Sequence, residues 1–209
     1  MNRKLLLIGA GGHAASVMDC ALASGSYEEV GVVEKNADAA GGITPVGCDE
    51  DLPRLFEEGW TDALVTVGSI GNTAVREKLA RLIEEIGFFI PVIADPSAVV
   101  SPAAVIGPGT FIGKRAVVNT GTVIGRHAIV NTGAVIEHDC RIGDFCHISP
   151  GTVLCGKVYV EDRAHVGAGS VVRQGIRIGA RALVGAGSAV VKDVPPGVTA
   201  FGNPCRIIR

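Results

Sequence analysis

The chain has 209 residues, of which 47% are hydrophobic and only 4% aromatic, and its formal net charge at pH 7 is -2. A nearly balanced charge without a basic block gives no electrostatic basis for binding nucleic acid or an anionic membrane, so we expect neither partner. The 29 glycines and the scarcity of rings indicate a core of small aliphatic side chains, which favours a repetitive architecture.

The sequence gives no sign of membrane insertion or of a disulfide framework. No apolar run approaches the roughly 20 residues of a spanning helix, and the apolar start of the chain ends in glycines without a cleavage-like site. We therefore expect a cytoplasmic protein. The six cysteines form no CxxC pair, so we interpret them as small buried residues in a reducing compartment and expect no metal site.

The first part of the chain, residues 1–95, alternates strand patterns with helix patterns. Apolar residues spaced i, i+4, i+7, i+8 and i+11 from Val75 predict an amphipathic helix that ends at Gly87. Strand, helix and strand repeated in this way predict a small Rossmann-like α/β domain, about half of a full dinucleotide fold. The other expected elements are strands at 4–8, 30–33, 63–67 and 88–93 and a helix at 12–24.

A glycine-rich turn, GAGGH at residues 9–13, follows the first expected strand and opens the first expected helix. Backbone N–H groups and the helix dipole favour phosphate at such a turn, and Glu34 ends the second strand, where an acid commonly binds a ribose hydroxyl. These residues alone are compatible with an NAD site. They are also compatible with glycines that only let helix and strand pack closely.

Beyond the turn-rich junction ADPSA, an aliphatic residue recurs at every sixth position from Val100 to Val190, sixteen times without exception. Four residues after each lies a mostly small residue, and the exceptions, Val158, Ile176 and Val194, are 18 residues apart. Three hexads therefore make one coil. This pattern predicts an all-β parallel β-helix of hexapeptide repeats with a triangular cross-section over residues 96–209, including a C-terminal tail.

The segment VIEHDCRIGDFCHISPG, residues 135–151, concentrates the reactive side chains of the repeats. In the hexad register His138 faces outward, and Glu137 and Asp139 flank it. A carboxylate beside an imidazole fixes its tautomer, which makes His138 a plausible general base. His127 and His165 lack such neighbours, and we expect them to be merely solvated.

Three cysteines in or near this segment, Cys140, Cys146 and Cys155, raise the question of a covalent mechanism. Cys140 and Cys146 each lie four residues after an aliphatic position, where the repeat takes small residues. We therefore interpret them as packing residues and expect no acyl-enzyme.

The motif IEHDC, with VNTGA before it, GNPCR near the C-terminus and GAGGH near the N-terminus, resembles a known family. It is similar to the hexapeptide-repeat acyltransferases that modify activated bacterial sugars. That branch includes the UDP-4-amino-sugar N-acetyltransferases of bacillosamine biosynthesis, the GDP-perosamine N-acetyltransferases and the sialic acid O-acetyltransferase group. The resemblance implies a left-handed coil, acetyl-CoA as cosubstrate, no metal, and a homotrimer with its active sites between neighbouring prisms.

The resemblance also implies roles for individual residues. His138 matches the general base, Asp139 the adjacent carboxylate that increases its basicity, and Gly156 the backbone N–H that stabilises the oxyanion. The residues implied in acetyl-CoA binding are His147, Ala168 and Ala186. The residues implied in binding the nucleotide sugar are Gly11, Gly12 and His13 near the phosphates, Glu34, Lys35 and Gly68 near the nucleoside, and Asn131 near the sugar.

Three functions remain open at this point. The first is acetyl-CoA-dependent N-acetylation of a UDP- or GDP-linked 4-amino-4,6-dideoxy sugar by direct attack. The second is O-acetylation of sialic acid or another sugar, which the same base could catalyse. The third is a non-catalytic nucleotide-sugar-binding scaffold, against which the Glu137-His138-Asp139 triplet argues.

Overall fold

The N-terminal part of the protein is built on a three-stranded parallel sheet. In the computed structural model, which describes residues 3–35 and 44–208, the strand order is β2-β1-β3. The strands are β1 (Lys4–Ile8), β2 (Glu29–Val33) and β3 (Asp62–Val65). The helical elements are α1 (Gly12–Ala23), the 3-10 helix η2 (Asp49–Asp51), α2 (Leu52–Glu57) and α3 (Ala74–Ile86).

Helices cover both faces of this sheet because β1 is apolar on both sides. Leu5 and Leu7 pack in one cluster with Val17 of α1, whereas Leu6 and Ile8 pack in a second cluster with α2 and α3. Side chains alternate across a strand, so a continuous aliphatic run is the sequence of a strand buried on both faces. The predicted Rossmann-like layer is thereby confirmed.

Two details differ from the sequence-based expectation. Residues 88–93 do not form a further strand of this sheet, because Phe89 makes only an isolated bridge with Asp62 and Ile93 belongs to the solenoid. The helix η2–α2 was not predicted, since its six-residue α-helical part is too short to display a clear apolar period.

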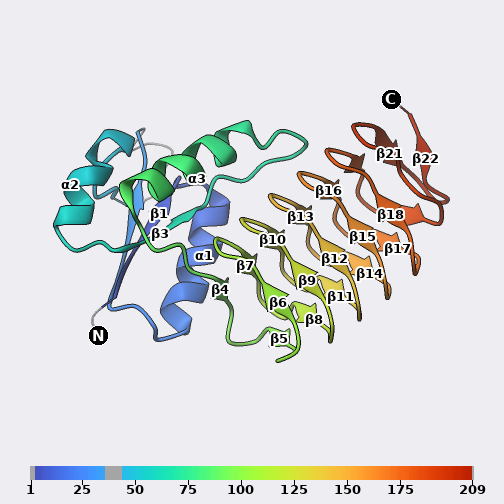
Figure 1. Ribbon diagram of the computed structural model, residues 1–209, viewed down its shortest axis with the longest axis horizontal. Coiled ribbons are helices and arrows are strands. Elements are labelled where there is room, and N and C mark those ends of the chain that lie inside the picture. The colour runs from blue at the N-terminus through green and yellow to red at the C-terminus, as the bar shows by residue number, and fades with distance from the viewer. Residues whose placement is uncertain (1–2, 36–43, 209) are drawn as a thin grey trace.

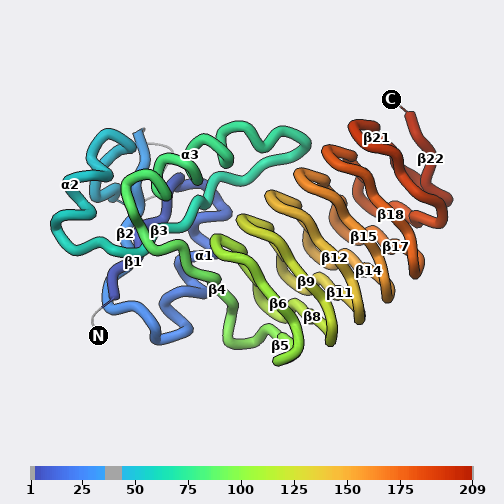
Figure 2. The backbone as a smooth tube through the Cα atoms, in the orientation of Figure 1, coloured from blue at the N-terminus to red at the C-terminus, as the bar shows by residue number. Residues whose placement is uncertain are grey.

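The rest of the chain is a solenoid of three parallel sheets that the chain visits in turn, coil after coil (Figures 1 and 2). Sheet B contains β4 (Ile93–Ala94), β7 (Phe111–Ile112), β10 (Ile129–Val130), β13 (His147–Ile148), β16 (His165–Val166), β19 (Leu183–Val184), β21 (Thr199–Phe201) and the antiparallel β22 (Arg206–Ile207). Sheet C contains β5 (Val99–Val100), β8 (Val117–Val118), β11 (Val135–Ile136), β14 (Val153–Leu154), β17 (Val171–Val172) and β20 (Ala189–Val190). Sheet D contains β6 (Val105–Ile106), β9 (Val123–Ile124), β12 (Arg141–Ile142), β15 (Tyr159–Val160) and β18 (Arg177–Ile178).

The register between coils is the one that the hexads predict. Ile136, for example, pairs with Val118 in the coil before it and with Leu154 in the coil after it, 18 residues away in each direction. Nearly all the sixth-position aliphatic residues are buried in one continuous core, with only Val100 and Ile106 of the first coil partly exposed. Each edge of the prism turns through a left-handed residue, which recurs at every sixth position from Gly109 to Gly187.

The two parts of the protein share a core and a set of polar contacts. Phe111 and Ile129 point outward from sheet B and pack in the same cluster as α1. From α3, the buried Arg76 donates hydrogen bonds to the carbonyl oxygens of His127 and Phe145. The prediction that Val75 begins the buried apolar face of this helix is wrong, because Val75 is 58% exposed whereas its neighbour Arg76 is only 2% exposed.

A charge in the aliphatic column should unfold the coils around it. Ile142 is 3% exposed, and we expect Ile142→Asp to lower the free energy of unfolding by more than about 4 kcal/mol, because an unpaired carboxylate would be buried. The control Ile142→Val, which removes one methylene, should cost only about 1 kcal/mol. Chemical denaturation followed by circular dichroism measures both, and equal midpoints for the two variants would contradict the packing described here.

Candidate active site

His138 lies on the edge of the prism between sheets C and D, which we call the C–D edge (residues 119–122, 137–140, 155–158 and 173–176). Its Nδ1 atom is 2.9 Å from Oδ2 of Asp139. A carboxylate can only accept, so the proton lies on Nδ1 and the lone pair of Nε2 is free. The same hydrogen bond is the main cause that lowers the pKa of Asp139. Both side chains are about half exposed, as a base that must meet a substrate requires.

Gly156 lies one coil further along the same edge, directly against the imidazole of His138. A Cβ atom added to Gly156 would collide with Nε2 of His138, so only glycine leaves room for the ring in this position. Among the residues that the structure describes, none accepts a hydrogen bond from the N–H of Gly156. The free ring nitrogen of His138 therefore lies against a residue whose backbone donor is unengaged.

The cysteines near His138 are poorly suited to act as nucleophiles. Cys140 and Cys146 are both fully buried in the core of the solenoid. Burial raises the pKa of both thiols, in Cys146 to about 12, and a protonated thiol is a weak nucleophile. Their interpretation as packing residues is confirmed.

The expectation that His127 and His165 are solvated is wrong, because they are 2% and 7% exposed. The His127 ring stacks on Phe145 at 5.0 Å, and its Nε2 lies 3.2 Å from a carboxylate oxygen of Glu84 on α3. His165 lies edge-on to the ring of His147 at 4.8 Å. The N-terminal part of the chain covers this side of the solenoid. The hexad pattern does not predict which side is covered.

His147 on sheet B and Asn131 on the edge between sheets B and C form a polar pair. Nδ1 of His147 lies 3.2 Å from the carbonyl oxygen of Ser69, which can only accept, so Nδ1 carries the proton. Nε2 then accepts a hydrogen bond from the Asn131 amide at 3.3 Å. Burial is the main cause that lowers the pKa of His147 to about 4, so the ring is neutral at pH 7. The structure thus links two residues that the sequence assigned to different ligands.

The glycine-rich turn lies at the carboxyl ends of the parallel strands. Gly9 has a φ of +105° and its added Cβ would lie 2.7 Å from Val67, so close packing explains this glycine. An added Cβ on Gly11, Gly12 or Gly68 would meet no heavy atom within 4 Å. Close packing therefore does not explain these three glycines, which border open space, Gly11 and Gly12 at the N-terminus of α1 and Gly68 in the loop after β3.

His13 follows this turn and is directed toward the solenoid. Its ring lies edge-on to Phe111 at 5.2 Å between ring centres. Burial, followed by the positive charge of Arg76, lowers the pKa of His13 to about 4. The imidazole is therefore neutral at pH 7 and can still donate one N–H.

A cavity of 260 Å³ lies beside the turn and contains two of the predicted nucleoside contacts, Glu34 and Lys35. Glu34 accepts a hydrogen bond from the N–H of Ala10 at 3.2 Å, and Lys35 pairs with Glu50 at 2.7 Å. Sequence reasoning missed other lining residues, although three of them share one face of α3 at spacings of three and four. The full lining is Gly9, Val33, Glu34, Lys35, Asp49, Val67, Val75, Lys78 and Leu79.

The two residues predicted along the pantetheine arm lie on a different edge from His138. Ala168 and Ala186 are both exposed and occupy equivalent positions in successive coils of the B–C edge (residues 131–134, 149–152, 167–170 and 185–188). Sheet C separates this edge from the C–D edge. One chain therefore does not bring these alanines and His138 together.

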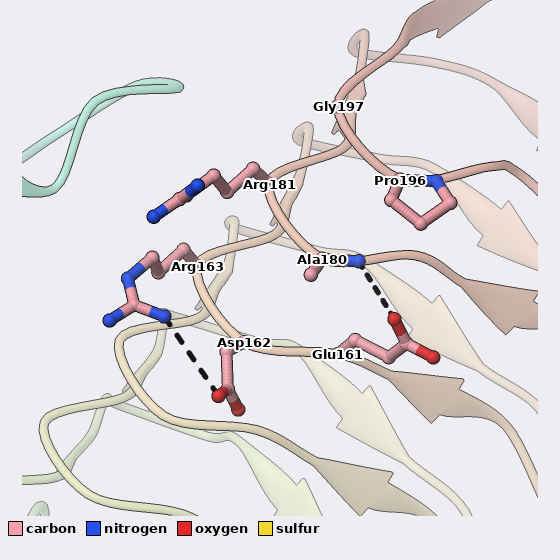
Figure 3. A pocket seen from close by; sticks show the side chains of 7 residues that line it. All are labelled: Glu161, Asp162, Arg163, Ala180, Arg181, Pro196 and Gly197. Atoms are coloured by element: carbon pink, nitrogen blue, oxygen red, sulfur yellow. Dashed lines mark hydrogen bonds and ion pairs between the residues drawn. The ribbon is translucent and has the colours of Figure 1, made fainter.

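A further cavity, of 590 Å³, lies on the third edge, between sheets D and B. Figure 3 shows Arg163 and Arg181 extending side by side from successive coils there. Arg163 also pairs with Glu77 of α3 at 2.8 Å. None of the predicted site residues lines this cavity.

Two further classes of site were sought within residues 3–35 and 44–208. No group of three or more His, Cys, Asp or Glu side chains in these ranges could hold a metal ion. None of the helices there is sufficiently long and apolar to cross a bilayer.

Family models match both parts of the chain. The model of the PglD N-terminal domain matches residues 4–83. The model described as bacterial transferase hexapeptide (six repeats) matches residues 103–138, 121–156 and 139–174, and the hexapeptide repeat of succinyl-transferase matches residues 157–192.

Solved structures resemble the whole chain. The acetyltransferase domain of PglB from Neisseria gonorrhoeae FA1090, in complex with acetyl coenzyme A, is 37% identical with a TM-score of 0.92 and coverage of 100% of both chains. PerB from Caulobacter crescentus, in complex with CoA and GDP-perosamine, is 39% identical with a TM-score of 0.92, over 99% of this chain and 97% of that one. WeeI from Acinetobacter baumannii AYE is 27% identical with a TM-score of 0.80, over 99% and 100%. The predicted fold, an α/β domain followed by a left-handed parallel β-helix, is confirmed.

Proposed function

The chain belongs to the hexapeptide-repeat family of acetyl-CoA-dependent sugar acetyltransferases, and we propose that it N-acetylates a UDP- or GDP-linked 4-amino-4,6-dideoxy sugar. The observation that carries the proposal is the contact of the His138 imidazole with Gly156, which puts a base and a free N–H donor at one place. Similarity to a structure that contains CoA and GDP-perosamine supports the choice of a nucleotide amino sugar.

His138 acts as the general base in this proposal. The sugar amine attacks the carbonyl carbon of the thioester, and Nε2 of His138 accepts the proton that the nitrogen loses. The tetrahedral intermediate then collapses, and the CoA thiolate that leaves takes the proton from the imidazole. Asp139 holds the proton on Nδ1 at 2.9 Å and stabilises the imidazolium that forms in between. A positioned base of this kind contributes roughly 10²- to 10⁴-fold.

Gly156 supplies the donor for the oxyanion. Negative charge develops on the thioester oxygen during the attack, next to the position where Nε2 receives the proton. Gly156 lies against the His138 ring and its N–H has no acceptor among the described residues, so it can donate to that oxygen without breaking another bond. One such donor is worth about 10²- to 10³-fold in turnover.

The nucleotide part of the substrate binds in the N-terminal domain. The open N-terminus of α1 at Gly11 and Gly12, together with His13, suits the diphosphate, since its backbone N–H groups favour an anion. Glu34 and Lys35, in the adjoining cavity, suit the nucleoside. Gly68 borders the loop that carries Ser69. From there the sugar extends along sheet B towards Asn131.

Acetyl-CoA lies between two copies of the chain in this proposal. Ala168 and Ala186 present exposed backbone along the B–C edge, and His147 lies on the neighbouring sheet. The thioester must reach His138, which lies across sheet C on the other edge of the same chain. A second copy whose C–D edge lies against this B–C edge completes the site.

The outward face of sheet C suits contact with further copies. Its outward positions are apolar in all six coils. Two of these side chains are strongly exposed to solvent in the single chain, Val99 at 64% and Val171 at 48%. A continuous apolar column of this kind on a surface is typical of an interface. We propose a homotrimer in which each prism turns sheet C towards the axis, because this ring brings unlike edges side by side. The column is Val99, Val117, Val135, Val153, Val171 and Ala189.

The substrate class is tested by thiol release from acetyl-CoA. We expect turnover with GDP-perosamine or a UDP-4-amino-4,6-dideoxy sugar, and no turnover with the corresponding free amino sugars, because the diphosphate and nucleoside supply binding energy. Calorimetry with the same compounds should give binding only for the nucleotide-linked sugars. Turnover of free sialic acid, or a calorimetric binding signal with sialic acid and with none of the nucleotide-linked sugars, would point instead to O-acetylation.

The base is tested by His138→Ala. We expect this variant to lose nearly all turnover, about 10²- to 10⁴-fold, while its affinity for both substrates stays the same, since the imidazole acts only on the proton in transit. Cys140→Ala is the matched control from the same motif and should remain active. Full activity of His138→Ala would overturn the assignment.

The shared site is tested by mixing two inactive variants. His138→Ala removes the base, and Ala168→Trp blocks the proposed path of the pantetheine arm. Co-expression of the two chains should restore about a quarter of the sites, because one interface in four then joins an intact B–C edge to an intact C–D edge. If the mixture stays inactive while both variants form trimers, the site does not lie between copies.

A further inference from the structure

We propose that Asn119 is a positioning residue of this enzyme, which acts through Glu137 on the backbone of His138. The inference rests on the proposed role of His138 as base. Asn119 belongs to the coil before His138 and precedes Glu137 by 18 residues, on the same edge of the prism. It is absent from the IEHDC motif and touches neither His138 nor Asp139.

The Asn119 amide is itself held in one orientation. Its Oδ1 accepts a hydrogen bond from the N–H of Thr120 at 2.7 Å, which fixes the side chain against its own backbone. The amide nitrogen then points to the next coil and donates to Oε2 of Glu137 at 3.0 Å. Because the acceptor side of the amide is engaged, the nitrogen side is the one that faces the carboxylate.

Glu137 transmits this contact to the catalytic residue. The same oxygen, Oε2, accepts a hydrogen bond from the backbone N–H of His138 at 3.3 Å. Asn119 therefore fixes the acceptor that in turn holds the peptide from which the imidazole extends. Glu137 is only half buried, so without the amide its carboxylate would be free to rotate towards solvent.

The coil below supports the neighbouring peptides in the same way. The hydroxyl of Thr122 donates to the carbonyl oxygen of Glu137 at 2.9 Å, and the N–H of Asp139 donates to the carbonyl oxygen of Thr120 at 3.0 Å. Residues on both sides of His138 are thus anchored to backbone or to short side chains. The hydrogen bond from the N–H of His138, in contrast, goes to the long side chain of Glu137.

This turn needs such support because it is strained and because the ring above it has little freedom. Asp139 adopts a φ of +59°, which is unfavourable for a residue with a side chain. The imidazole lies tightly against Gly156, so a small rotation of the His138 peptide would move Nε2 away from the reacting nitrogen. Misplacement by about 1 Å can cost 10²-fold in rate.

The experiment compares Asn119→Ala and Asn119→Asp with the wild-type trimer, using acetyl-CoA and the acceptor sugar that the wild type turns over. We expect both variants to lose about 10- to 100-fold in kcat with KM for both substrates unchanged. Asn119→Asp keeps the acceptor for Thr120 but replaces the donor to Glu137 by a carboxylate, so it separates this link from the local turn. Wild-type turnover in Asn119→Asp would overturn the proposal.

A double-mutant cycle provides the second measurement. If Asn119 acts through Glu137, Asn119→Ala should change kcat by less than about 2-fold in a Glu137→Ala background. Independent, multiplying losses would contradict the proposed route. Ser101→Ala is the matched control, since Ser101 occupies the equivalent position one coil earlier and its hydroxyl accepts from the N–H of Ala103, within its own turn. It should keep full turnover.

The two proposals fail separately. If His138→Ala is fully active, the assignment of His138 as general base is wrong, and the proposed role of Asn119 in positioning it is wrong as well. If His138→Ala is inactive while Asn119→Ala retains wild-type kcat, the base stands and the role of Asn119 is refuted.

Discussion

The stacking of coils at a fixed interval of 18 residues is the constraint on which the rest of this structure depends. Parallel strand pairing binds each coil to the next, and a column of Val, Ile and Leu fills the space inside. A slip of one residue would turn this column outward, so the register is strongly specified. The conformation of the edges is restricted too, because a left-handed residue recurs at every sixth position from Gly109 to Gly187.

This strict register explains why the candidate site consists of contacts between coils. Asn119 meets Glu137, and Gly156 accommodates the ring of His138, each across one coil interval. Side chains that are distant in sequence are thereby held at the spacing of neighbouring strands, about 4.8 Å. A rigid scaffold of this kind can keep a base, its carboxylate and a backbone donor aligned before any substrate arrives, which limits the reorganisation that the reaction requires.

The junction between the two parts of the chain is the second rigid feature. Phe111 and Ile129 extend the core of the N-terminal sheet onto the solenoid, and the buried Arg76 is bonded to carbonyl oxygens of two solenoid edge residues. A buried guanidinium is costly to leave unpaired, so these bonds resist separation of the two parts. The loop after β3 is held over sheet B by the bond between His147 and Ser69. The proposed nucleotide subsite therefore keeps a fixed relation to the sheet along which the sugar is proposed to lie.

The sequence by itself determined the solenoid, the coil length, the buried thiols and the outward position of His138, because each follows from a period that repeats along the chain. Only the tertiary structure decided that His127 is buried beneath α3 and that Asn131 bonds to His147. The first joins two unlike surfaces, the N-terminal domain and a face of the solenoid, and the second joins side chains of successive coils beneath the loop that carries Ser69. A periodic pattern records how a repeating unit packs against its own copies, and it carries no information about what covers the outside of the stack.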